Sequence, residues 1–98
     1  MNNRRIQFTP SARSQFLEGI AYIQKENPDA AKRFRNKVEI KLKQLIDYPD
    51  SGRVVLEFPD LPFRELLISP YRFFYKLKDD TIWIVAVWHH SQEIENPK

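Results

Sequence analysis

The chain has no cysteine and only two glycines among its 98 residues. Without thiols it can form neither a disulfide framework nor a thiolate metal site, and a reducing cytoplasm is its natural compartment. Gly19 and Gly52 are too few to build a glycine-rich phosphate loop. No serine stands in the strand-to-helix setting of a hydrolase nucleophile. These absences exclude nucleotide-binding enzymes and hydrolases of the Ser-His-Asp type.

Long apolar runs are missing as well. No stretch approaches the ~18 apolar residues that predict a membrane span, and the first ten residues, MNNRRIQFTP, lack the apolar core of a signal peptide. We therefore expect a cytoplasmic protein with no membrane partner. The length fits one domain over residues 1–98, in which the polar end, 91–98, forms a flexible tail.

Net charge is small, +3, but unevenly placed. The segment from Pro28 to Asp47 contains six basic and three acidic residues. Its surplus of positive charge equals that of the whole chain. Such a face attracts nucleic acid or an acidic protein, although an ordinary solvated helix face has the same composition. The candidate surface comprises Lys32, Arg33, Lys37 and Lys41.

The first half of the chain predicts one strand and two helices. Arg4 to Phe8 alternates polar and apolar residues, as a half-buried strand does. Thr9-Pro10 and Asn27-Pro28 are each a helix-start signal. Apolar stripes at helical spacing follow, Ala12, Phe16, Ile20 and Ile23 in the first helix and Ala31, Phe34, Val38, Leu42 and Leu45 in the second. We expect an αα-hairpin from about Pro10 to Asp47.

Beyond Gly52 the apolar period becomes strand-like. The predicted strands are Val54–Phe58, about Phe63–Ile68, Tyr71–Leu77 and Thr81–Trp88. Short loops between them favour antiparallel neighbours. The expected fold is α+β, in the order β-α-α-β-β-β(-β), with the helical hairpin packed on a twisted antiparallel sheet.

Two histidines, His89 and His90, follow the last apolar run. If the strand continues through them, they point to opposite faces and cannot share a metal ion. We expect no metal and no cofactor. Either ring could serve as a general acid or base, because imidazole titrates near neutral pH, or could simply end the strand in water.

Arg64 and Arg72 lie on adjacent predicted strands joined by a tight turn. Two guanidinium groups on one face could hold a phosphate and stabilise charge during its transfer. The alternative is that they form salt bridges to Glu65 or Glu57. The strand register decides between one shared face and two opposite faces, because a slip of one residue reverses a side chain.

Arg72, Phe74 and Lys76 share one face of their strand, and Tyr71, Phe73 and Tyr75 share the other. The first set is the better candidate for a partner surface, to which we add Trp88. A simple solvated face is the alternative.

Several segments together resemble the RelE/ParE superfamily of toxins from type II toxin-antitoxin modules. They are Arg64-Glu65-Leu66-Leu67, Tyr71-Arg72-Phe73-Phe74-Tyr75, the strand Ile84-Val85-Ala86-Val87-Trp88-His89, Asn27-Pro28-Asp29-Ala30-Ala31 and the turn Tyr48-Pro49-Asp50-Ser51-Gly52-Arg53. The resemblance covers nearly the whole chain. It implies a toxin that is neutralised by a cognate antitoxin, in a toxin-antitoxin hetero-oligomer.

The superfamily has two branches, and the resemblance leaves both open. In the ParE-like branch the target is DNA gyrase. In the RelE-like branch the toxin cuts mRNA on the ribosome, and Arg64, Arg72 and His89 or His90 would be the catalytic candidates. Leu66 stands where ribosome-dependent members carry a further basic residue, which favours the ParE-like branch. An inactive member that acts only as a binding module is the third reading.

Overall fold

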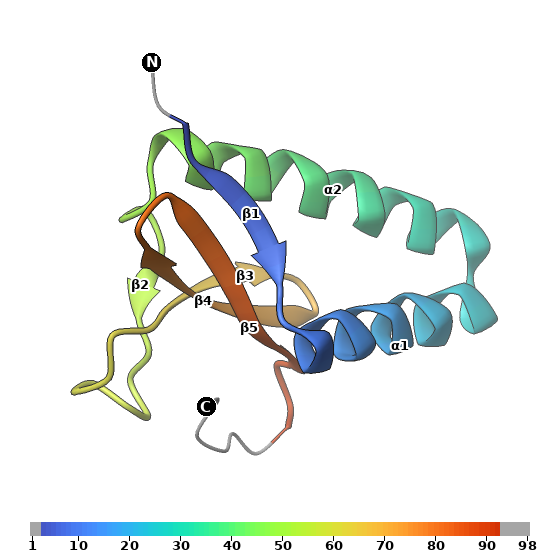
Figure 1. Cartoon of the computed structure of the whole chain (residues 1–98). Helices are drawn as coiled ribbons and strands as arrows, with labels where there is room; N and C mark the ends of the chain where they lie inside the picture. The colour runs from blue at the N-terminus through green and yellow to red at the C-terminus, as the bar shows by residue number, and fades with distance from the viewer. Residues whose placement is uncertain (1–2, 93–98) are drawn as a thin grey trace.

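A computed structural model describes residues 3–92 of the chain. Figure 1 shows its elements, two helices and five strands. In chain order they are β1 (Arg5–Phe8), α1 (Pro10–Glu26), α2 (Pro28–Asp47), β2 (Arg53–Val54), β3 (Arg64–Ile68), β4 (Tyr71–Lys78) and β5 (Thr81–His89). The predicted α+β class and element order are confirmed.

The five strands form one sheet in the order β1-β5-β4-β3-β2. Strands β2 to β5 pair antiparallel, but β1 lies parallel to β5, so the sheet is mixed and not antiparallel throughout. Parallel neighbours need a long connection, and here the rest of the chain separates the two strands in sequence. The first and last strands thus lie side by side in the sheet (Figure 1).

Both helices begin at the predicted caps. The Thr9 Oγ1 accepts a hydrogen bond from the Ala12 N–H at 3.2 Å, and the Asn27 Oδ1 accepts one from the Ala30 N–H at 3.1 Å. Asn27 also ends α1, so a single residue joins the two helices. All five predicted stripe residues of α2 are buried. Four of them, Phe34, Val38, Leu42 and Leu45, pack together with the α1 stripe on the sheet face that carries Tyr71, Phe73 and Tyr75.

The predicted strand Val54–Phe58 is wrong in its length, because β2 ends at Val54. The chain then turns twice, with hydrogen bonds from the Phe58 N–H to the Val55 carbonyl and from the Leu61 N–H to the Phe58 carbonyl. Residues 55–63, hereafter the covering loop, pack on the sheet face opposite the helices. Their apolar side chains form a second core with the sheet, which comprises Val55, Phe63, Phe74, Val85 and Ala86 with Phe58, Leu61, Trp83 and Trp88 at its edge.

Neither helix in residues 3–92 is apolar over a length that could cross a membrane. The tail expected at 91–98 lies largely outside the described residues, since only 91 and 92 are described, in the turn and bend after β5.

Candidate functional site

Arg72 is the centre of a cluster of charges on the sheet face that the covering loop occupies. Its Nε and Nη2 donate to the two carboxylate oxygens of Glu65, both at 2.6 Å. Its Nη1 and Nη2 donate to the two oxygens of Glu57, at 2.9 and 3.0 Å. Glu65 lies one strand away on β3, and its carboxylate also lies 3.5 Å from the Arg53 Nε. The guanidinium group of Arg72 therefore forms a bidentate ion pair with each of two carboxylates.

Burial makes this cluster unusual. The Glu65 side chain is fully buried, that of Arg72 is 11% exposed, and that of Glu57 is 42% exposed. The hydrogen bonds that Arg72 donates to Glu65, and to a lesser extent those to Glu57, raise the pKa of Arg72, so it stays charged. The hydrogen bond from Arg72 in turn lowers the pKa of Glu57. The alternative in which Arg72 pairs with Glu65 or Glu57 is confirmed, and it pairs with both.

Arg64 does not join this cluster. In the β3–β4 register Arg64 lies opposite Tyr75, whereas Arg72 lies opposite Leu67, so the two arginines point to opposite faces of the sheet. The Arg64 Nη1 donates to the Gly52 carbonyl at 2.9 Å, and its Nε lies 3.8 Å from Asp50. Of the two arrangements that the sequence left open, the structure has the one with Arg64 and Arg72 on opposite faces, so these two side chains do not converge on one anion.

Phe74 does not lie on an open surface either, whereas Lys76 is half-buried. Phe74 has no exposed area, because the apolar side chains of the covering loop lie over it. The Arg72 guanidinium carbon lies 5.2 Å from the centre of the Phe74 ring, and the Lys76 Nζ lies 5.7 Å from the centre of the Phe63 ring. The expectation that Phe74 meets a partner is corrected by this burial, since its ring is part of the second core.

His89 and His90 lie together, because β5 ends at His89 and the chain turns there. Their rings stack with centres 4.6 Å apart, and the His89 ring meets the Tyr71 ring edge-on at 5.3 Å. The His89 Nδ1 is 2.7 Å from the Ser91 Oγ. Within residues 3–92, no group of three histidine, aspartate or glutamate side chains converges to hold a metal ion.

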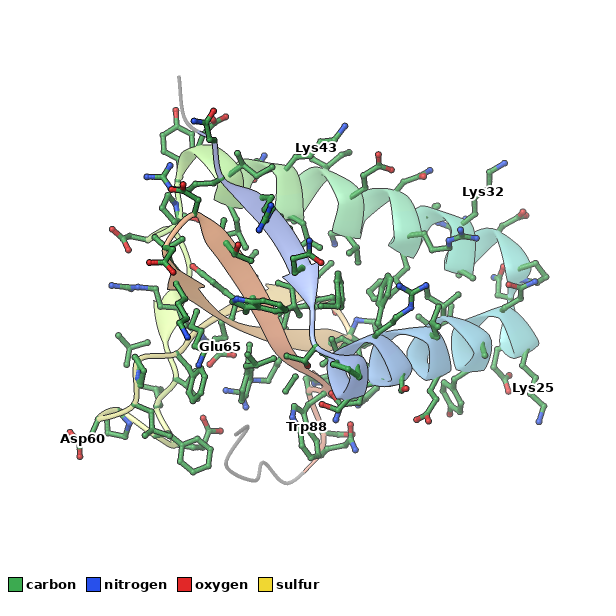
Figure 2. All side chains as sticks on the ribbon, in the orientation of Figure 1. Lys25, Lys32, Lys43, Asp60, Glu65 and Trp88 are labelled. Atoms are coloured by element: carbon green, nitrogen blue, oxygen red, sulfur yellow. The ribbon has the colours of Figure 1, made fainter. Side chains whose placement is uncertain are left out.

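Trp88 lies opposite Arg72 in the β4–β5 register, on the edge of the second core. Figure 2 shows it near the end of β5. Its Nε1 is buried and makes no hydrogen bond to any of the described residues. The role of Trp88 in a partner surface stays a prediction.

The basic residues of α2 mostly face solvent. Lys32, Arg33 and Lys37 are exposed and Lys41 is half-buried. Lys32 and Lys43 both project outward from α2 in Figure 2. Glu39 lies 3.7 Å from Lys43 and offsets part of the charge.

Sequence reasoning did not predict the groove that lies beside β1. Two cavities, of about 480 and 340 Å³, share Phe8 and Phe16 in their linings. The larger is lined by Phe8, Phe16, Lys32, Arg35, Asn36, Val38, Glu39 and Leu42, and the smaller by Ile6, Gln7, Phe8, Arg13, Phe16 and Leu17. The alternation in Arg5–Phe8 marked a strand, but no sequence signal marked its outer edge as free.

Comparison with known proteins places this geometry in a family. The family model for the ParE toxin of the type II toxin-antitoxin system parDE matches residues 6–94. A curated protein of Sinorhizobium fredii (strain NBRC 101917 / NGR234), described as "Putative toxin Y4kP", is 34% identical over 97 residues, which are 95% of each chain.

A solved structure has the same fold. It is described as "Chromosomal ParDE TA system from P. aeruginosa", and the match has a TM-score of 0.70 at 16% identity, covering 88% of this chain and 95% of that one. At this identity the likeness concerns the fold alone. The family model and the curated relative, which both span nearly the whole chain, show that this protein belongs to the ParE toxin family of type II toxin-antitoxin systems.

Proposed function

We propose that this ParE-type toxin stops growth in the cytoplasm by acting on DNA gyrase, and that it does not cut RNA. The observation that carries the proposal is the pairing of Arg72 with Glu65 and Glu57. A nuclease needs a cation free to bind the scissile phosphate and to stabilise the charge that develops on it. Four hydrogen bonds from the Arg72 guanidinium already go to carboxylates.

The other nuclease candidates are also dispersed. Arg64 lies opposite Tyr75 on β4, and His89 lies opposite Tyr71. Four residues of extended strand separate these two positions by roughly 13 Å. Neither side chain shares the sheet face of Arg72. This arrangement supports a binding activity over ribosome-dependent cleavage, in which charge partner and acid-base group must meet at one phosphate.

Pulse labelling after induction of the toxin tests the target. Newly made DNA should fall before newly made protein, because gyrase acts on replication directly. A fall in protein synthesis first would point to the ribosome and contradict the proposal. Unchanged growth at full expression would favour the inactive binding module and equally contradict it.

We further propose that a cognate antitoxin neutralises the toxin by laying an extended segment along β1. The Arg5 N–H donates to the Asp80 carbonyl just before β5, and the Thr9 N–H donates to the Ile84 carbonyl within β5. Residues alternate in direction along a parallel strand, so the peptide groups of Ile6 and Phe8 face the other way, toward the free edge. That edge can accept an added strand.

The side chains beside this edge indicate which kind of antitoxin segment would fit. Phe8, Phe16 and Leu17 offer apolar contacts, while Lys32 and Arg35 line the α2 wall. Alternate residues of an added strand point to opposite sides. A segment that alternates apolar and acidic residues therefore matches the groove.

Leu17→Asp tests the groove. Leu17 is 53% exposed and lines the smaller cavity, so an aspartate there should leave the fold intact and weaken antitoxin binding by about tenfold or more. Leu77, 44% exposed on β4, is absent from both linings, and Leu77→Asp is the matched control. Isothermal titration calorimetry measures the affinity of each variant for the protein encoded beside the toxin gene. Equal affinities for the two variants would place the antitoxin elsewhere.

A further inference from the structure

A third cavity lies on the other side of α1, away from the groove beside β1. Its volume is about 390 Å³. It is lined by residues of α1, β4, β5 and the following turn, namely Gln15, Glu18, Gly19, Tyr22, Tyr71, Val87, Trp88, His89 and Gln92. Nothing in the proposed function uses it.

Tyr71 brings an unpaired hydroxyl to this cavity. The residue is only 7% exposed, yet its Oη forms no hydrogen bond with any group in residues 3–92. Tyr75 differs, because its Oη accepts from the Gly52 N–H and donates to the Pro49 carbonyl, both at 2.8 Å. This hydroxyl is not among the fully buried, unpaired side-chain atoms of the described residues, so it stays accessible and can bond a ligand that enters the cavity.

The position of the hydroxyl depends on Gly19. A Cβ at Gly19 would lie 2.9 Å from the Tyr71 Cζ and 3.1 Å from its Oη. The phenol thus lies directly against the backbone of α1. Burial, with a smaller contribution from Tyr22, raises the pKa of Tyr71, so the group stays a neutral phenol that can accept a hydrogen bond.

The remaining polar groups of the cavity are rich in acceptors. The Gln15 Oε1 accepts from the Val87 N–H at 2.8 Å, and the Gln92 Oε1 accepts from the His89 N–H at 2.7 Å. These bonds fix both amide oxygens along the part of β5 that extends beyond its pairing with β1, and each oxygen keeps a second lone pair. Glu18 adds a carboxylate, and the described lining residues include no lysine or arginine.

We propose that this cavity binds the guanidinium group of an arginine side chain on a protein partner. Arginine has five N–H donors and no acceptor, which matches the Glu18 carboxylate, the free Tyr71 oxygen and the two amide oxygens. Its planar group also stacks on aromatic rings, which Tyr22 and Tyr71 supply. A phosphate-bearing ligand finds no cation in this lining and would meet the Glu18 carboxylate.

Heteronuclear NMR on the full-length toxin tests the site with a minimal probe. N-acetyl-arginine methylamide is the probe, and the citrulline analogue, a neutral group of nearly the same shape, is the matched ligand control. Arginine should produce saturable shifts of the Gly19 and His89 amide signals, and citrulline should bind at least tenfold more weakly.

Two variants link the binding to the named groups. Glu18→Gln and Tyr71→Phe should each weaken arginine binding about tenfold, the effect of one lost hydrogen bond to a charged group. Tyr71→Phe removes no internal hydrogen bond, so its fold and stability should match the wild type. Glu26→Gln, also exposed on α1 but outside the cavity, should bind arginine normally.

Three results would overturn the proposal. They are the absence of saturable shifts with arginine, equal binding of citrulline, and wild-type binding by both cavity variants. The proposal would also be overturned if adenosine monophosphate, and not arginine, shifted the Gly19 and His89 amide signals. That result would mean that the cavity binds a planar nucleobase.

Discussion

A buried charge must be matched by an opposite one, and Arg72 is matched twice. Glu65 is fully buried beside it, while Glu57 reaches it from the covering loop at the protein surface. Burying both partners costs desolvation that their attraction roughly repays, so the intact pair adds little net stability. Losing one partner is different, because the other charge is then left buried alone.

Arg72→Ala should therefore destabilise the fold by ~3–5 kcal/mol, since Glu65 stays buried without its main partner. Arg53→Ala is the control. Arg53 contacts the same carboxylate at 3.5 Å, but its side chain is 62% exposed, and such pairs contribute about 1 kcal/mol or less. Urea denaturation at pH 7 measures both variants. Equal, small losses would mean that Glu65 finds other partners when Arg72 is absent.

Glu57 makes the cluster sensitive to acid. Its folded-state pKa is lowered by the hydrogen bond from Arg72, so the pair contributes stability above the unfolded-state pKa of about 4.5. This contribution is lost as the pH falls through the lowered folded-state value. Glu57→Gln should consequently reduce the loss of stability between neutral pH and pH 3, as measured by urea denaturation across that range. Identical pH profiles for variant and wild type would show that Glu57 is not held by Arg72 in solution.

Among the elements, those with local signals were predictable from the sequence. Thr9-Pro10 and Asn27-Pro28 fixed where the helices begin, because cap and proline chemistry act within a few residues. The covering loop was not predictable. Val54 to Phe58 is apolar enough for a strand. Packing against the sheet instead buries Val55 and partly buries Phe58, a tertiary effect that no local pattern records.

For the same reason, only part of the candidate site could be predicted from the sequence. The sequence suggested that Arg72 pairs with Glu65 or Glu57, but the face of Arg64 depended on a register across Ser69-Pro70. The structure pairs Ile68 with Tyr71 around this turn, which fixes the register and separates the two arginines. The parallel pairing of β1 with β5 joins residues more than 70 positions apart, beyond the reach of any local pattern.

Gly52 joins the end of the helical hairpin to β2 and shows how tightly these elements fit. Its N–H donates to the Tyr75 hydroxyl and its carbonyl accepts from Arg64. A Cβ here would overlap the Tyr75 hydroxyl and lie 2.7 Å from the Glu65 carbonyl oxygen. The backbone of β3 cannot give way as a flexible side chain can.

Gly52→Ala should therefore destabilise the protein by about 1–3 kcal/mol, the usual cost of overpacking. Ser51→Ala, at an exposed position in the same turn, is the control and should change stability little. Thermal unfolding followed by circular dichroism compares the two. A stable Gly52→Ala protein would contradict the close contact of Tyr75 and β3 with this turn.

At the scale of the whole molecule, the two faces of the sheet have different roles. The helical hairpin covers one face and leaves the groove beside β1 and the cavity at Tyr71 at its margins. The covering loop closes the other face over Phe74 and brings Glu57 to Arg72. In our account the chain keeps its binding surfaces around the hairpin, and the charged side chain best suited to hold a phosphate is used internally.

We propose that this ParE-type toxin acts on gyrase without nuclease chemistry. The most direct measurement adds one preparation of the purified toxin to gyrase with relaxed plasmid and, in parallel, to ribosomes programmed with mRNA. We expect the toxin to inhibit supercoiling in proportion to its concentration and to leave the mRNA intact. Normal supercoiling together with cleaved mRNA would contradict it, and would mean that Arg72 leaves its carboxylates when the ribosome binds.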